Sequence, residues 1–190
     1  MSRLIMLLMM LALAPISRAE SYLNFLSEEV MPLHDKLFET NFVVSQDPPM
    51  CEKNKLIRGF FFSKYRAIYL CLENLLEDPR LGNIDGSGKD KDARLQLSRT
   101  LTHEAVHAAQ SCPTGVPELI GVRTDLPPVI QRRIQFLLYS RYGHGVSAIE
   151  REAFEIQSRT DAVPLLTRLL AERCSALVPQ PPDKLQVRKR

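Results

Sequence analysis

The sequence predicts an α+β protein that is mainly helical and carries a small antiparallel sheet. Two short runs rich in aromatic and branched residues, 58–63 and 65–72, enclose a turn and are typical of a pair of strands. Four other segments have the apolar spacing or the start signals of helices: 21–40, 92–111, 128–141 and a region from 147 to about 174. The 190-residue chain shows no internal repeat, and residues 20–178 suffice for one domain with its own core.

Residues 1–19 are predicted to be a secretory signal peptide. Arg3 supplies a positive charge ahead of an apolar run from Leu4 to Ala14, and Ser17-Arg18-Ala19 offers small residues for cleavage. That run is too short to span a bilayer comfortably. We therefore expect an exported mature chain, in the periplasm, a lumen or the extracellular space.

The predicted mature chain is nearly neutral. Without Arg3 and Arg18 the formal net charge falls from +3 to +1, which gives no support to nucleic-acid binding. Residues 179–190 form a proline-rich, basic tail, which we interpret as a solvated end. The alternative for this tail is a weak contact with an anionic membrane surface.

The elements follow in order. The first helix, 21–40, is interrupted by Pro32, and the two strands come next. A polar, glycine-containing connector, 83–92, leads into the helix at 92–111. A proline-interrupted loop, 112–127, precedes the helix at 128–141. The last helical region begins after Ser147, continues its apolar stripe through Ala162 and Val163, and reaches about Cys174.

Four cysteines in an exported chain predict two disulfides, for which three pairings are possible. We favour Cys51–Cys71, around the strand pair, and Cys112–Cys174, which would tie the end of the helix at 92–111 to the end of the last helix. A cysteine zinc site is the weaker alternative, because no short Cys-x-x-Cys spacing is present.

Residues 103–107, His-Glu-Ala-Val-His, carry the clearest chemical signal. Positions i and i+4 share one helix face, so His103 and His107 can bind one metal ion. Glu104 is then placed to deprotonate a metal-bound water, which is the arrangement of a zinc hydrolase. The neighbouring residues are uncharged and small or apolar, as expected for a helix buried around its metal. The alternative is a buried helix with two hydrogen-bonded histidines.

A third protein ligand is expected on the last helical region. Glu150 is our candidate, because Glu150-Arg-Glu-Ala153 has the Glu-x-x-Ala form of many zinc peptidases, in which the small residue lets two helices approach. Glu152 and His144 remain alternatives for this ligand. Glu150 could instead be a capping carboxylate at a helix start.

These segments resemble the metalloprotease family of the mitochondrial intermembrane space that matures a mitochondrially encoded ATP-synthase subunit. The matching features are an apolar strand ending in Cys71, the motif helix with Cys112 close behind it, and the later Glu150-x-x-Ala153. The resemblance implies a zincin-like metallopeptidase core, but not the ATP-synthase substrate. Gln110 stands where that family usually carries Asp, and the stretch between the motif and Glu150 is longer here.

We therefore expect an exported zinc metallopeptidase that acts on a peptide or protein substrate. Zn²⁺ would be held by His103, His107 and Glu150, with Glu104 as general base. His144 or Tyr142 is the candidate for stabilising the oxyanion. The strand at 66–72 is the candidate edge for pairing with an extended substrate. The alternative function is a non-catalytic, disulfide-stapled binding or assembly protein that retains the fold.

Overall fold

The computed structural model describes residues 21–78, 87–142 and 148–175. It is mainly helical with one three-stranded sheet, so the predicted α+β class is confirmed. The predicted signal peptide, the basic tail and His144 lie outside the described residues. The elements are 3-10 helices η1 (Tyr22–Phe25), η2 (Glu28–Val30) and η3 (Ser63–Tyr65), strands β1 (Val43–Gln46), β2 (Gly59–Phe62) and β3 (Ala67–Leu70), and helices α2 (Met31–Glu39), α3 (Pro49–Lys53), α4 (Leu72–Leu76), α5 (Ser87–Gln110), α6 (Pro128–Tyr142), α7 (Ala148–Gln157) and α8 (Ala162–Cys174).

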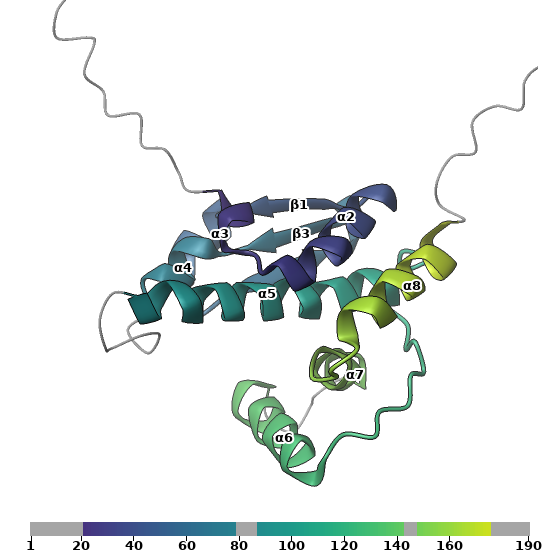
Figure 1. Ribbon diagram of the computed structural model, residues 1–190. Helices are drawn as coiled ribbons and strands as arrows, with labels where there is room; N and C mark the ends of the chain where they lie inside the picture. The colour runs from purple at the N-terminus through teal and green to yellow at the C-terminus, as the bar shows by residue number, and fades with distance from the viewer. Residues whose placement is uncertain (1–20, 79–86, 143–147, 176–190) are drawn as a thin grey trace, which may run out of the picture.

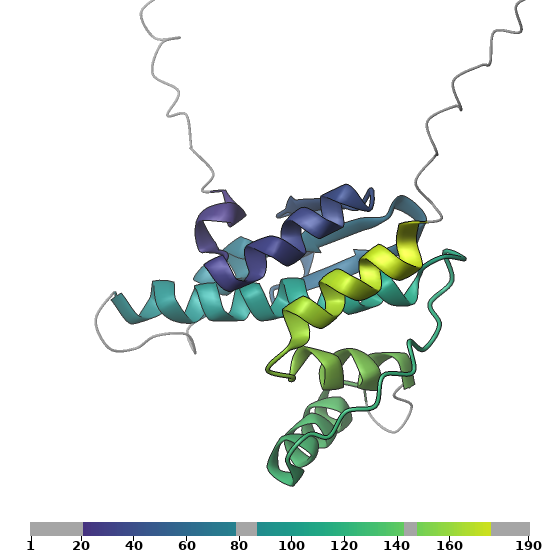
Figure 2. The ribbon, with the colours of Figure 1, turned by 45° about the vertical axis from the view of Figure 1, so that its right-hand side comes forward.

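Helix α5 is the axis of the molecule (Figure 1). The sheet lies on one side of it, and α7 followed by α6 lies on the other. Figure 2 shows α2 and α8 side by side, and both pack against α5. Its apolar side chains from Leu97 onward are fully buried, and small residues at positions 105, 108 and 109 let these neighbours approach closely. The helix begins at Ser87, so the predicted connector at 83–92 is wrong over its last residues. That first part of α5 carries no apolar stripe from which periodicity could identify it.

The sheet has the order β1-β3-β2. Strands β2 and β3 pair antiparallel, as predicted, whereas β1 pairs parallel with β3, so the sheet is mixed rather than antiparallel. Strand β3 is therefore central, and the prediction that the strand at 66–72 offers a free edge is wrong. Strand β2 is an outer strand, and it packs against α5.

Two predicted helical regions are divided. Residues 21–30 form two short 3-10 helices, and the α-helix begins only at Met31, because Pro32 is tolerated in a first turn but not in a helix interior. The stripe after residue 147 is broken between Gln157 and Ala162, so that α7 and α8 are separate helices. Because of this break, α7 and α8 pack against different sides of α5 (Figure 2).

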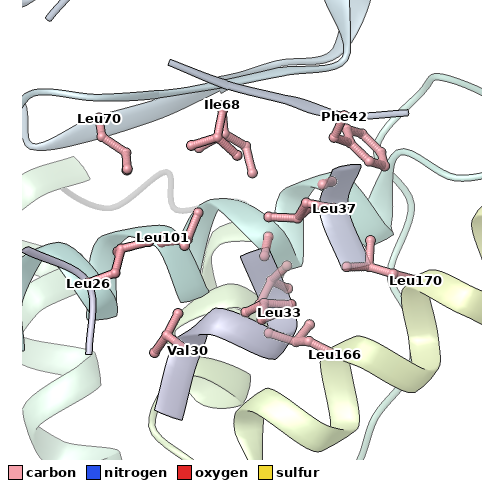
Figure 3. Packing of buried hydrophobic residues seen from close by; sticks show 14 of the residues in the cluster. Leu26, Val30, Leu33, Leu37, Phe42, Ile68, Leu70, Leu101, Leu166 and Leu170 are labelled. Atoms are coloured by element: carbon pink, nitrogen blue, oxygen red, sulfur yellow. The ribbon is translucent and has the colours of Figure 1, made fainter. Parts of the chain in front are cut away.

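The main core lies where the sheet, α2, α5 and α8 meet (Figure 3). Leu33 and Leu37 of α2, Ile68 of β3 and Leu101 of α5 are fully buried there, together with Leu166 and Leu170 of α8. Each such side chain contributes about 1.5–3 kcal/mol relative to its exposed state. A smaller cluster of Leu126, Ile134 and Leu138, with Ile130 and Phe154 against it, seats α6 on α7.

Both favoured disulfides are present. Cys51–Cys71 joins α3 to the residue after β3, and Cys112–Cys174 joins the chain just after α5 to the last residue of α8. Two disulfides are consistent with export into an oxidising compartment. Within residues 21–78, 87–142 and 148–175, no helix has the length and hydropathy that crossing a membrane requires.

Gly59 permits the close approach of β2 to α5. A Cβ atom at this position would lie 2.5 Å from Cγ2 of Thr100 and 2.9 Å from the main-chain oxygen of Tyr69. The Thr100 methyl cannot simply turn away, because its hydroxyl donates to the Gln96 carbonyl at 2.8 Å. The absence of a side chain at Gly59 therefore sets the distance between the sheet and the helix that carries His103 and Glu104.

Replacing Gly59 by Ala should lower the free energy of unfolding by about 1–3 kcal/mol, the usual cost of overpacking. Urea denaturation would measure the change. The double variant Gly59→Ala/Thr100→Ser, which lacks the Cγ2 methyl, should recover only part of the loss, because the contact with the Tyr69 oxygen remains. An unchanged urea midpoint for Gly59→Ala would contradict this account of the packing.

Candidate metal centre

His103 and His107 lie one turn apart on α5, as the motif predicts. Their ring centroids are 4.9 Å apart and the rings are nearly perpendicular, at 86°. Each imidazole side chain is only 12% exposed. Both Nε2 atoms face the carboxylate of Glu150, near the start of α7, at 3.5 Å from Oε2 for His103 and 3.4 Å from Oε1 for His107. The predicted ligand set is thus brought together from two helices.

The spacing of these three side chains fits a tetrahedral metal site. Tetrahedral bonds of zinc to nitrogen and oxygen, about 2.0–2.2 Å long, place two neighbouring ligand atoms about 3.4 Å apart. The separations of the two Nε2 atoms from Glu150, 3.5 Å to Oε2 for His103 and 3.4 Å to Oε1 for His107, are close to this value. All three ligand atoms lie within 4.8 Å of one another. The partly buried α5–α7 contact therefore offers two nitrogens and one carboxylate to a single ion, which would leave one of four tetrahedral positions to another ligand.

Glu152, the alternative ligand, serves another purpose. Its carboxylate accepts hydrogen bonds from the main-chain N–H groups of Ile120 and Gly121, at 2.8 and 2.7 Å, and from Nε2 of Gln110 at 2.9 Å. The side chain is buried among these donors. Glu152 therefore anchors the loop after α5 instead of facing the two histidines.

Glu104 lies beside the histidines and is almost completely buried, at 6% exposure. The main-chain N–H of Phe61, in β2, donates to its carboxylate. Burial raises the pKa of Glu104, although the two neighbouring histidines and the Phe61 hydrogen bond act in the opposite direction. A carboxyl group with a raised pKa and one fixed donor suits a group that takes up a proton near neutral pH.

The histidines and Glu150 perturb one another electrostatically. Hydrogen bonds from His103 and His107 hold the pKa of Glu150 far below its usual range. Burial opposes protonation of His107, but its hydrogen bond with Glu150 and the charge of Glu104 outweigh this effect and raise its pKa. Glu150 is therefore an anion in the cluster, as a metal-binding carboxylate must be.

Two glutamines at the site, Gln110 and Gln157, have contacts with the histidines that the sequence did not predict. Oε1 of Gln110 lies 2.7 Å from Nδ1 of His107, and Oε1 of Gln157 lies 3.2 Å from Nδ1 of His103. Gln110, three residues after His107, was noticed only as a departure from the related motif. Nothing in the sequence pointed to Gln157, because its contact depends on how α7 packs against α5.

Of the two oxyanion candidates, His144 lies outside the described residues, and Tyr142 is the last residue of α6. The ring that does contact a predicted ligand is Phe154, whose centroid lies 4.4 Å from that of His103. Phe154 also packs against the small cluster that seats α6, so this ring of α7 links His103 to α6.

Comparison with known proteins gives a family but no described activity. No curated protein and no solved structure matches this chain. One family model, described as a domain of unknown function (DUF8637), matches residues 22–169. That span contains the three candidate ligands, Glu104 and both glutamines. Because the match covers most of the chain, the protein belongs to the DUF8637 family.

Proposed function

We propose that this protein is an exported zinc-dependent peptidase with a zincin-like core. The observation that carries the proposal is the partly buried cluster of His103, His107 and Glu150, with the buried carboxylate of Glu104 beside it. When bound, zinc supplies Lewis acidity, which polarises a carbonyl and makes a water molecule acidic near neutral pH. Zinc is preferred because two imidazoles and one carboxylate are a common catalytic zinc set.

In this proposal Glu104 performs the proton transfers. Its carboxylate takes a proton from the attacking water and then donates it to the amine that leaves the cleaved peptide bond. Burial raises the pKa of Glu104, which helps it to hold the proton between the two steps. The N–H of Phe61 keeps the carboxylate oriented while the protonation state changes.

Strand β2 replaces β3 as the proposed edge for an extended substrate. The N–H of Cys71 donates to the Arg58 carbonyl, and the alternation of an antiparallel pair then joins Phe60 and Phe62 to β3. The main-chain groups of Gly59 and Phe61 consequently face away from β3, and no described strand pairs with them. The Phe61 N–H already donates to Glu104, so the Phe61 carbonyl is the group proposed to pair with a substrate. A peptide added along this edge would lie next to Glu104, because Phe61 already contacts it.

The metal content of the mature chain tests the proposal. We expect about one zinc per chain in the wild type, and loss of zinc in His103→Ala and in Glu150→Ala, because each removes one of three protein ligands. His34→Gln is the matched control: His34 is also buried, but its Nε2 lies against the hydroxyl of Tyr22. We expect this variant to retain zinc.

Two outcomes would contradict the proposal. A folded wild type that binds no metal even after zinc is supplied would exclude the zinc site. Zinc that is lost with His103→Ala but retained in Glu150→Ala would exclude Glu150 as the third ligand and reopen the assignment to His144.

A further inference from the structure

Gln110 is fully buried, with 0% exposure, at the last residue of α5. Its Nε2 lies 3.0 Å from the Ile149 carbonyl and 2.9 Å from Oε2 of Glu152. A carbonyl and a carboxylate only accept hydrogen bonds, so the NH₂ end of the amide must face them. The oxygen end of Gln110 is therefore turned to His107, 2.7 Å from Nδ1.

The orientation of the amide determines the state of the imidazole. Because Oε1 of Gln110 can only accept, Nδ1 of His107 must carry a proton and donate it. When Nε2 is also protonated it donates to Glu150; when the ring is neutral, as metal binding requires, the lone pair is on Nε2, the atom that faces Glu150. A chain of one-way hydrogen bonds, from Gln110 to Glu152 and from His107 to Gln110, thus selects the tautomer that can bind a metal in the cluster.

Gln157 repeats this arrangement for the other histidine. Its Nε2 donates to the Arg99 carbonyl at 3.1 Å, so its Oε1 is the end that lies 3.2 Å from Nδ1 of His103. The Nε2 atom of His103 is again left facing Glu150. Both rings are therefore held by neutral amides, one within α5 and one from α7.

We propose that Gln110 and Gln157 are positioning residues that commit His103 and His107 to metal binding through Nε2, with Glu152 fixing the Gln110 amide. This inference rests on the proposed zinc site. It also links that site to the loop after α5, because Glu152 accepts from Ile120 and Gly121 as well as from Gln110. The buried carboxylate of Glu152 therefore holds this loop and, through Gln110, also fixes the orientation of His107.

Zinc affinity, measured by competition with a chromophoric chelator, tests the positioning role directly. Gln110→Met keeps the length of the side chain but removes both ends of the amide. We expect it to raise the zinc dissociation constant about 10- to 100-fold, the usual effect of losing such a partner. Gln157→Met should act in the same direction but less strongly, because its contact with the ring is longer.

Ser111→Ala is the matched control. Ser111 is the neighbour of Gln110, is equally buried, and donates its hydroxyl to the Ala108 carbonyl at 2.7 Å. It should lower the unfolding temperature without changing zinc affinity. The visible spectrum of the Co²⁺-loaded protein adds a second readout, since it should change in Gln110→Met and remain as in the wild type in Ser111→Ala.

A charge swap separates orientation from packing. Gln110→Glu alone places two carboxylates side by side in a buried site and should weaken zinc binding. The double variant Gln110→Glu/Glu152→Gln restores a donor opposite an acceptor and should recover part of the affinity; recovery is incomplete because the new amide loses the Ile120 hydrogen bond and the new carboxylate faces the Ile149 carbonyl. This recovery is not expected if Gln110 merely fills space.

The outcomes distinguish this inference from the proposed function. Wild-type zinc affinity in both Gln110→Met and Gln157→Met would overturn the positioning role while leaving the zinc site intact. A wild type that binds no zinc would overturn both. Should Gln110→Met fail to fold, then Gln157→Met, on the more exposed side chain, decides the matter together with the charge swap.

Discussion

Replacing Glu104 by Gln is expected to lower the rate of peptide hydrolysis by about 10²–10⁴-fold while leaving zinc bound. The amide has nearly the same shape and can still accept the Phe61 hydrogen bond, but it cannot take a proton from water. Its effect should appear in kcat more than in KM, because the lost interaction is made during the chemical step. Activity against a peptide library, with zinc content measured in parallel, checks both parts.

The stability of this variant is informative as well. Burial raises the pKa of Glu104, so the folded state holds its charged form at a cost relative to water. A neutral amide removes that cost, and we expect the unfolding temperature of the metal-free Glu104→Gln protein to be unchanged or higher. A fall in activity therefore cannot be attributed to unfolding.

Glu155→Gln provides the control for Glu104→Gln. Glu155 is a carboxylate of α7 whose Oε2 accepts from the Thr124 hydroxyl, outside the cluster. Full activity is expected for this variant. If Glu104→Gln also retained full activity, Glu104 would not be the base. A wild type that binds zinc but cleaves no peptide, with Glu104→Gln behaving normally in cells, would favour the non-catalytic binding or assembly protein.

Features that depend on residues close together in the sequence could be predicted from local rules. The i, i+4 spacing places His103 and His107 on one face whatever α5 packs against. Cys112 follows the end of α5 and Cys174 is the last residue of α8, so their pairing could be proposed once the two helices had been predicted. The β2–β3 hairpin follows from a turn between two aromatic-rich runs.

The errors and omissions come from contacts between distant segments. Strand β1 has only four residues, and its parallel partner β3 begins more than 20 residues later, so no turn signal joins the two. Without β1, the central strand β3 was mistaken for an edge. The role of Glu152 depends on Ile120 and Gly121, and that of Gln157 on the Arg99 carbonyl. Such contacts exist only after α7 has packed on α5.

Removing the Cys112–Cys174 disulfide should have the largest effect on stability. This bond closes a sequence separation of 62 residues, and Cys51–Cys71 one of 20. The chain-entropy estimate is about 4 kcal/mol for the longer loop and about 3 kcal/mol for the shorter. We expect Cys112→Ala/Cys174→Ala to lose more free energy of unfolding than Cys51→Ala/Cys71→Ala. Urea denaturation of both double variants under identical conditions measures the difference.

The two disulfides should also differ in their effect on the metal centre. Cys112 follows Gln110 by two residues, and Arg173 of α8 donates to the carbonyls of Ala109 and Cys112, at 3.1 and 3.0 Å. These contacts hold the end of α5 where Gln110 meets His107. Loss of Cys112–Cys174 should therefore weaken zinc binding, whereas loss of Cys51–Cys71, which joins α3 to the residue after β3, should not. Equal zinc affinity in the two double variants would show that the end of α5 keeps Gln110 in place without the covalent link.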